Sequence, residues 1–190
     1  GSEMCIRDRV YGAQGASARF FRALASAPLH LLPAGGHQRL RPLQVDELAE
    51  VVVRWLRGWP PGPDDRAAVL DLVGGTEVTY RDMLAAYRAS MGFAPAWRVT
   101  VPGWLIGASA ALLDRVPGSM LTRDTWRMLR AGNTADVAAT AQALGRLPAG
   151  IDTFIRPADA PALCQQALAA WRPGLLRGAL ALIWLWTAVC

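Results

Sequence analysis

Few residues of this sequence combine a reactive side chain with a partner at a useful spacing. The three cysteines, Cys5, Cys164 and Cys190, lie far apart and form no C-x-x-C pair. The two histidines, His30 and His37, have no carboxylate or cysteine near them at metal-ligand spacing. Zinc sites and disulfide frameworks depend on such clusters. The sequence therefore argues against a metal site and against a fold held together by disulfides.

The positive charges are all arginines. The chain has 20 basic residues, none of them lysine, and a formal net charge of +5. Together with abundant alanine, glycine and proline, this composition is typical of GC-rich coding sequence. The arginines are scattered, and no basic block alternates with aromatic residues as a nucleic-acid surface requires. We therefore expect no nucleic-acid partner.

Length and composition predict a folded domain. The chain has 190 residues, of which 53% are hydrophobic and 18% charged, which is enough for one proper core. Residues 1–9, GSEMCIRDR, have neither the apolar stretch nor the cleavage site of a secretory signal. They resemble a translated adapter remnant, and the first two residues alternatively resemble a vector scar, so we leave this leader out of the fold expectations.

Residues 10–75 alternate extended pieces with helices. A helix is expected around Phe20, Phe21 and Leu24 and ends at Pro28. Segment 29–45 indicates two extended pieces in a hairpin around a Gly-Gly turn, and segment 67–75, AAVLDLVGG, a buried strand. Between them, segment 45–58 predicts a helix whose apolar stripe comprises Leu48, Val51, Val52, Trp55 and Leu56.

The later part of the chain is mainly helical. Segment 79–92 predicts a helix with a variant capping box, formed by Thr79 and Asp82, and with Gly92 at its C-terminal end. A short strand at 97–102 follows. Further helices are expected within 103–118, 122–133 with Thr122 as N-cap, 134–148 and 150–171. Strands alternating with helices, followed by helices alone, predict an α/β unit with a helical cap.

Several segments together resemble a known family. They are VYG at 10–12, GGHQRLRPLQVDELAEVV at 35–52, LDLVGGTEVTYRDMLAAYRASMG at 70–92 and LTRDTWRMLRAGNTADVAATAQALG at 121–145. This order is similar to the C-terminal half of extended or atypical short-chain dehydrogenases/reductases. The nearest group is the NAD(P)-binding epimerase/dehydratase-like proteins related to the complex I accessory subunit. The resemblance covers about residues 10–155 and implies the C-terminal fragment of a Rossmann-type domain, a helical substrate-side cap and a terminal hydrophobic helix.

The sequence also departs from that family. No G-x-x-G-x-x-G or G-x-G-x-x-G turn is present to hold the pyrophosphate of a dinucleotide. The family's catalytic Tyr-x-x-x-Lys pair is absent, because the residues four positions after the three tyrosines are Gly15, Leu84 and Met91. Without a lysine, no ammonium can lower the phenol pKa for acid–base work. NAD or NADP is therefore expected in the complete parent and not in this fragment.

The resemblance assigns four residues to a site. Tyr11 and Gly12 match the segment that passes beside the nicotinamide, and the alternative is a plain strand end with a glycine turn. Arg39 or Arg41 could hold an anionic substrate group by a bidentate contact, and the alternative is a solvated hairpin arginine. Family members often carry the contacting arginine at the position of Leu40. No catalytic residue or metal ligand is assigned.

The chain ends in an apolar run, GALALIWLWTAVC, at 178–190. Its uncharged part is shorter than the roughly 20 residues that cross a bilayer. Tryptophans and arginines flank or interrupt it, as interface anchors do: Trp171, Arg172, Arg177, Trp184 and Trp186. The run resembles the first transmembrane segment of a DoxX-like domain. A truncated membrane helix and a soluble packing helix are the two alternatives.

These observations divide the chain into a leader at 1–9, part of an NAD(P)-binding Rossmann-like domain at 10–75 and a helical cap at 76–157. A linker with a lead-in helix at 158–172 and the hydrophobic helix at 173–190 follow. The expected function is that of a fragment of an NAD(P)-dependent oxidoreductase or epimerase-like enzyme, inactive alone. The alternative is a non-catalytic dinucleotide-binding module of a membrane-associated redox assembly.

The expected partners belong to the parent protein: a dinucleotide and a small-molecule substrate, with a membrane contact through the C-terminal helix in the membrane alternative. The expected location is cytoplasmic, with anchoring to the inner membrane in that same alternative.

Overall fold

The computed structural model describes residues 10–58, 70–113, 123–132 and 134–189. It is a mixed α/β structure that is mostly helical, so the predicted class is confirmed at this level. The described strands are short and form three separate two-stranded sheets. These are β1 (Val10–Tyr11) parallel with β4 (Leu43–Gln44), β2 (Leu29–Pro33) parallel with β6 (Trp97–Val101), and β3 (Arg39–Leu40) antiparallel with β5 (Val78–Thr79).

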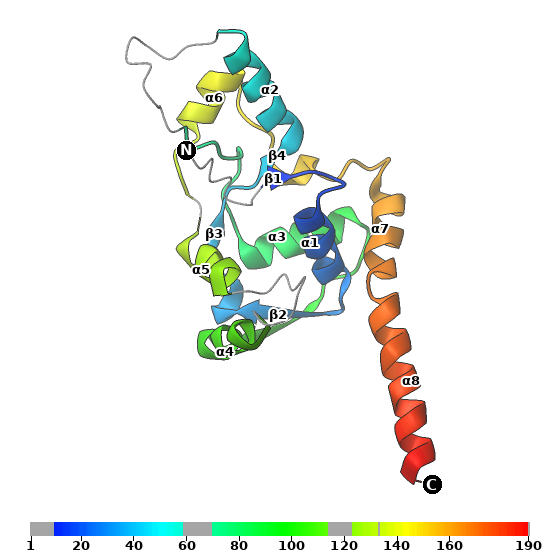
Figure 1. Ribbon diagram of the computed structural model, residues 1–190. Helices are drawn as coiled ribbons and strands as arrows, with labels where there is room; N and C mark the ends of the chain where they lie inside the picture. Colours follow the sequence, from blue (N-terminus) through cyan, green and yellow to red (C-terminus); the bar gives the residue numbers. More distant parts are fainter. Residues whose placement is uncertain (1–9, 59–69, 114–122, 133, 190) are drawn as a thin grey trace.

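The helices surround these small sheets (Figure 1). They are α1 (Ala16–Ser26), α2 (Val45–Leu56), α3 (Tyr80–Ser90), α4 (Gly103–Leu113), α5 (Arg123–Ala131), α6 (Ala138–Leu144), α7 (Ala160–Ala169) and α8 (Arg172–Val189), with 3₁₀ turns η1 (Ala34–Gly36) and η2 (Ile151–Thr153). The predicted helices of the second half are thus present, while Thr122, the expected N-cap of α5, lies outside the described residues.

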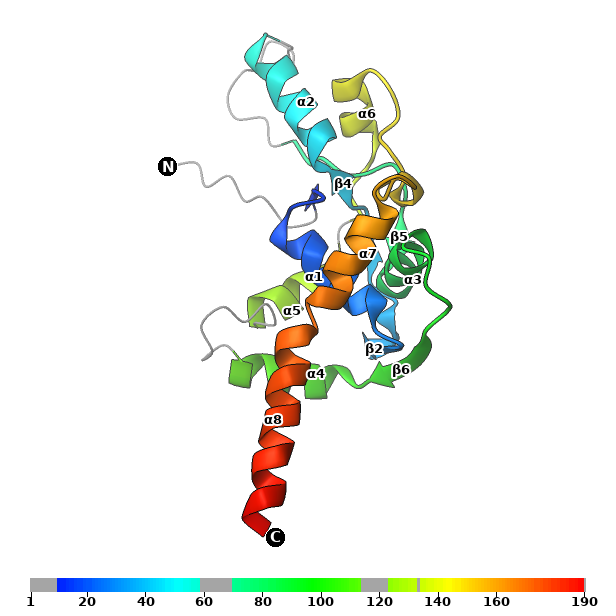
Figure 2. The ribbon, with the colours of Figure 1, turned by 90° about the vertical axis from the view of Figure 1, so that its right-hand side faces the viewer.

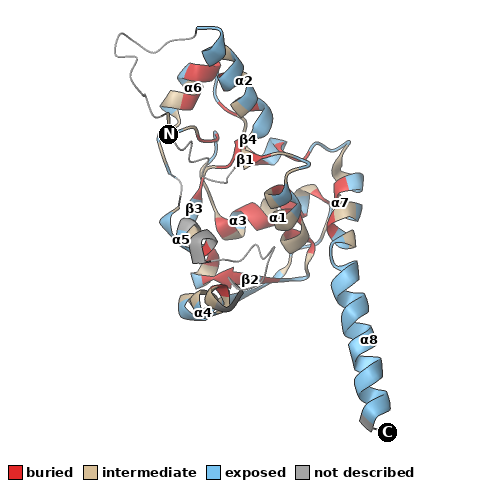
Figure 3. Cartoon of the chain, in the orientation of Figure 1, coloured by how far each residue is buried: buried red, intermediate tan, exposed pale blue. Residues whose placement is uncertain are grey.

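Helix α3 forms the centre of the main core. The Thr79 side chain accepts a hydrogen bond from the backbone N–H of Asp82 at the start of the helix. Just after its end, Gly92 has a φ of 82°, and both ends agree with the predicted capping pattern. Helix α1 contacts both α3 and α7. Figure 3 shows the buried residues concentrated on α3 and its neighbours. The buried stripe of α3 comprises Tyr80, Met83, Leu84 and Tyr87.

A smaller cluster joins α2 to α6, away from the main core (Figure 1). Helix α2 is present as predicted, but its buried face is not the apolar stripe expected. Val51 and Glu47 are buried, whereas Trp55 and Leu56 are exposed. Val51 packs on Ala143 and Leu144 of α6, and Arg146 donates to the Glu47 carboxylate at 2.6 Å on the same side of the helix.

The predicted hairpin does not form. Strands β2 and β3 both exist, but β2 pairs with β6 and β3 pairs with β5. The turn between them is a short 3₁₀ element in which Gly35 and Gly36 have φ values of 79° and 70°. This left-handed backbone, which glycine adopts at little cost, sends the chain away from β2 instead of back along it.

The strand predicted at 67–75 is also wrong over its described part. Residues 70–75 form no strand. Two isolated backbone hydrogen bonds tie this segment down instead: Gly74 N–H donates to Arg41 O at 3.2 Å, and Gly75 N–H donates to Ala149 O at 3.3 Å. Residues 67–69 lie outside the described residues.

Helix α8 continues past α7 and extends away from the rest of the molecule, as the two views at right angles show (Figures 1 and 2). Its leucine, isoleucine and tryptophan side chains are exposed, so the packing alternative finds no support. Within the described part of the chain, no helix combines the length and apolar character needed to cross a membrane. The membrane-helix expectation therefore finds no support either.

Candidate functional site

The two arginines assigned to substrate binding come together in the structure, and a carboxylate of the same chain lies between them. Arg39 Nη1 lies 2.9 Å from Glu77 Oε1, and Arg41 Nε lies 3.3 Å from Glu77 Oε2. Strand β3 carries Arg39, and the antiparallel strand β5 begins just after Glu77, which places the three side chains at one end of this sheet. We call Arg39 and Arg41 the arginine pair.

The electrostatics of this cluster follow from its geometry. The hydrogen bond from Arg39 lowers the pKa of the Glu77 carboxyl, and Arg41 adds to the shift, while partial loss of hydration opposes them. Glu77 therefore stays ionised well into the acidic range. Arg39 is 72% exposed and Arg41 is 21% exposed, so the pair is open to solvent on its Arg39 side. Such an exposed ion pair is weak, and a stronger anion can replace it.

Tyr11, the residue assigned to cofactor contact, is part of the core. Its side chain is 4% exposed, and its ring stacks on Phe154 with 4.8 Å between centroids. Its hydroxyl accepts a hydrogen bond from Arg22 at 3.2 Å. At Gly12, a Cβ atom would lie 3.1 Å from Val45 Cγ1, so a neighbouring side chain already fills the space beside this glycine. Contact of either residue with a cofactor stays a prediction.

A dinucleotide does not fit the residues that would have to hold it. Tyr11 and Gly12 are surrounded by side chains of the chain itself. The turn before α1 is closed by its own backbone, because Gly15 N–H donates to Gly12 O at 2.8 Å. A pyrophosphate site needs free N–H groups at a glycine-rich turn. The described residues at β1 and α1 do not provide one.

Sequence reasoning missed Arg22, which is completely buried in α1. Its guanidinium donates to Ala13 O at 2.6 Å and to Gln166 Oε1 at 2.8 Å in addition to the Tyr11 hydroxyl. Arg22 thus ties β1 and α1 to α7. The sequence feature that could have predicted its burial is its spacing, since Ala18, Arg22 and Ala25 lie at positions i, i+4 and i+7 on the buried face of α1.

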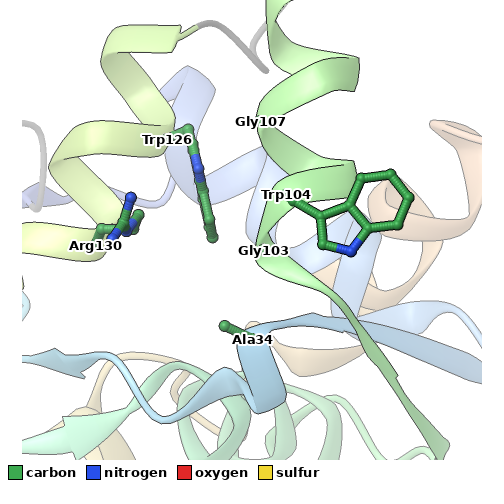
Figure 4. Close-up of a pocket in the computed structure, with 6 residues that line it drawn as sticks. All are labelled: Ala34, Gly103, Trp104, Gly107, Trp126 and Arg130. Atoms are coloured by element: carbon green, nitrogen blue, oxygen red, sulfur yellow. The ribbon is translucent and has the colours of Figure 1, made fainter.

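Sequence reasoning also missed a pocket of about 430 Å³ between α4 and α5. Figure 4 shows the Trp126 ring projecting from α5 toward α4, with Arg130 one turn further along α5 and Ala34 below the ring. Ala34 belongs to η1 and has a φ of 46°. We call this space the α4–α5 pocket; its lining consists of Ala34, Gly103, Trp104, Gly107, Trp126 and Arg130.

The pocket and the arginine pair are two places where described residues gather groups able to hold a ligand. The sites lie on different elements: the pocket on α4, α5 and η1, the arginine pair on β3 and the residues just after it. In the portions of the chain that the structure describes, no three histidine, cysteine or acidic side chains gather where a metal ion could sit.

No protein-family model matches the sequence, and none of the curated proteins does. Among solved structures, the fold is similar to the crystal structure of a nucleoside-diphosphate-sugar epimerase from Staphylococcus aureus. The similarity has a TM-score of 0.53 at 16% sequence identity, and it covers 72% of this chain and 46% of the epimerase chain. The chain therefore spans just under half the length of that neighbour. At this identity the comparison shows a likeness of fold.

Proposed function

We propose that this chain forms the substrate-side part of an NAD(P)-dependent oxidoreductase of the epimerase/dehydratase-like kind. The observation that carries the proposal is the likeness of fold to the nucleoside-diphosphate-sugar epimerase over 72% of the chain. The order of elements supports it, because short parallel strands with connecting helices precede a mainly helical part. In this proposal, residues 10–75 belong to the dinucleotide-binding domain and residues 76–157 form its cap.

The dinucleotide would supply hydride transfer, and the protein would supply binding and orientation. The site residues of this chain do not form the cofactor cradle, so we assign them no step through the dinucleotide. The chain also contains no lysine, and a tyrosine–lysine proton-transfer pair cannot be built from its residues alone. We therefore expect the isolated chain to bind substrate without converting it.

The proposed substrate carries a diphosphate, as a nucleoside-diphosphate sugar does. Guanidinium groups bind phosphate oxygens through paired, charge-assisted hydrogen bonds. Arg39 and Arg41 already direct donors at one carboxylate, that of Glu77. A diphosphate would take the place of this carboxylate, because its greater charge and larger number of oxygens make the stronger contact. Glu77 holds the two arginines in position until then.

Calorimetric titration with UDP-glucose tests this role. We expect the chain to bind UDP-glucose, the Glu77→Gln variant to bind more tightly, and the double variant Arg39→Gln/Arg41→Gln to lose binding. Arg156→Gln serves as the matched control, because Arg156 also forms an exposed ion pair, with Asp159 at 2.7 Å. Titration with NADPH, followed by cofactor fluorescence, should give no saturable signal.

Two results would contradict the proposal. Equal affinity of the double variant and the Arg156→Gln control would remove the arginine pair from the site. Saturable NADPH binding by the chain would show that a dinucleotide site does exist here, and this would favour a dinucleotide-binding module over a substrate-side part.

A further inference from the structure

The α4–α5 pocket has the size and shape of a small-molecule site. Its volume of about 430 Å³ lies within the range of ordinary ligand pockets, roughly 300–1,000 Å³. Gly103 and Gly107 face the Trp126 indole from α4, and Cβ atoms there would lie 3.4 and 3.7 Å from the nearest ring atoms. Because both positions are glycines, α4 leaves room beside the indole instead of filling it with side chains.

Trp126 contributes an N–H donor to the pocket. The side chain is only 7% exposed, and its Nε1–H donates to no acceptor among the described residues. An acceptor atom entering the pocket could therefore receive a hydrogen bond from this indole.

The charge around the pocket is positive. Arg130 lies four residues after Trp126 on the same face of α5, and it forms no ion pair within the described ranges. Helix α4 begins at Gly103 on the pocket wall, so its positive N-terminal end also faces this space. None of the described residues that line the pocket is acidic. An anion is therefore the ligand that this electrostatic environment favours.

The rest of the wall is apolar and flat. It consists of the Trp126 indole, Ala34 and the glycines of α4. Trp104 contributes at the rim, and Figure 4 shows its ring turned away from Trp126. Aromatic faces favour a flat or cyclic apolar partner, to which they can stack.

We propose that the α4–α5 pocket binds a small organic anion with a flat apolar body, whose acidic group contacts Arg130 and the Trp126 indole N–H. The ligand class is an aromatic or cyclic carboxylate or phosphate. The proposal does not depend on the proposed oxidoreductase role, because the pocket and the arginine pair share no residue.

The test uses the indole N–H signals of the eight tryptophans in a ¹⁵N-labelled chain. 1-Naphthoate is the probe, with neutral 1-naphthalenemethanol and inorganic phosphate as comparison ligands. The Trp126→Phe variant identifies the Trp126 signal. We expect naphthoate to shift this signal saturably and the other indole signals little, with much weaker binding of the alcohol and of phosphate.

Three variants sharpen the result. Arg130→Gln should weaken naphthoate binding about tenfold or more, the loss expected for a hydrogen bond to a charged group. Arg98→Gln, which removes an exposed arginine of β6, should leave binding unchanged. Gly107→Leu keeps a helix-favouring residue in α4 and should abolish binding by filling the pocket.

Four outcomes would overturn the proposal. They are equal binding of naphthoate and the alcohol, equal binding of naphthoate and phosphate, unchanged affinity in Arg130→Gln, and a uniform shift of all indole signals. The first and third would remove the anionic group from recognition, the second would remove the apolar body, and the fourth would indicate adsorption to exposed apolar surface.

Discussion

Arg22 is a buried cation that lacks an anionic partner among the described residues. Supplying such a partner should therefore change the free energy of unfolding by a measurable amount. It is 0% exposed, and no carboxylate in the described segments lies within ion-pair distance of it. Its three acceptors are the Tyr11 hydroxyl, the Ala13 carbonyl and the Gln166 amide oxygen. Desolvating a guanidinium costs several kcal/mol, which neutral acceptors offset only in part.

Replacing Gln166 with glutamate would place a negative charge where the amide oxygen now lies, 2.8 Å from Arg22 Nη2. At an effective dielectric constant of about 20, two unit charges roughly 4 Å apart attract by about 4 kcal/mol. Desolvating a half-buried carboxylate cancels part of this gain. We therefore expect Gln166→Glu to raise the free energy of unfolding by about 1–2 kcal/mol at neutral pH.

Urea unfolding measures the effect, and Gln165→Glu is the matched control. Gln165 is the preceding residue of α7 and is exposed, so this variant adds the same charge without the contact. The arginine should depress the pKa of the introduced carboxyl. The gain should therefore be complete above the unfolded pKa of about 4.3 and should disappear as the pH falls through the lower folded value. An equal effect of the two variants at pH 7 would refute the reasoning.

Three further predictions concern packing and titration. Gly74→Ala should cost about 2–4 kcal/mol in urea unfolding, because its Cβ would overlap the carbonyl oxygen just before β4, whereas Gly178→Ala, in open space on α8, should be neutral. Burial lowers the pKa of His30, and nearby arginines add to the shift. The free energy of unfolding should therefore fall as the pH drops from about 6.5, the pKa of an unfolded histidine, toward the lower pKa of His30 in the folded chain. His30→Gln should flatten this pH dependence, and the control His37→Gln should not. Burial raises the pKa of Tyr80 to about 12, so absorbance at about 295 nm near pH 11 should show less tyrosinate in the folded chain than in the denatured chain.

The helices could be predicted from the sequence because their signals are local. Helix α3 carries its stop and start signals within its own segment, Thr79 at the beginning and Gly92 at the end. Strand β6 was likewise correctly placed from its β-branched residues. Local propensity decides these cases, since each element's hydrogen bonds or side-chain pattern lie within a few residues.

The pairing of strands could not be predicted in the same way. Residues 70–75 read as a buried strand, yet among the described residues their backbone N–H groups bond singly to three separate segments, at Arg41, Thr140 and Ala149. The partner of a strand is set by distant segments, and a short apolar run does not reveal whether one is available. The expected hairpin failed for the same reason, because the residues of β2 pair with residues of β6 that lie 68 positions later in the chain.

Contacts over long sequence distances account for the remaining misses. Of the apolar stripe of α2, Val51 is buried but Trp55 and Leu56 are exposed, and Glu47 is buried in an ion pair with Arg146, 99 residues away. Arg39 and Arg41 were both named as candidate substrate contacts, and this role stays a prediction. Glu77 lies 38 residues from Arg39, and no local pattern indicates that it would contact both guanidinium groups. A single sequence shows which groups can pair and not which pairs form.

One short segment, 34–41, takes part in both candidate binding regions. Its first residue, Ala34, lines the α4–α5 pocket, and its end carries the arginine pair. Ala34, Gly35 and Gly36 all have positive φ, and for alanine this backbone costs about 1–2 kcal/mol. The side chain of Gln38 donates to the carbonyl of the residue before this turn at 2.8 Å, which closes it. The two regions are thus joined by one closed turn of unusual backbone geometry, so a substitution that changes the turn should disturb anion binding at both.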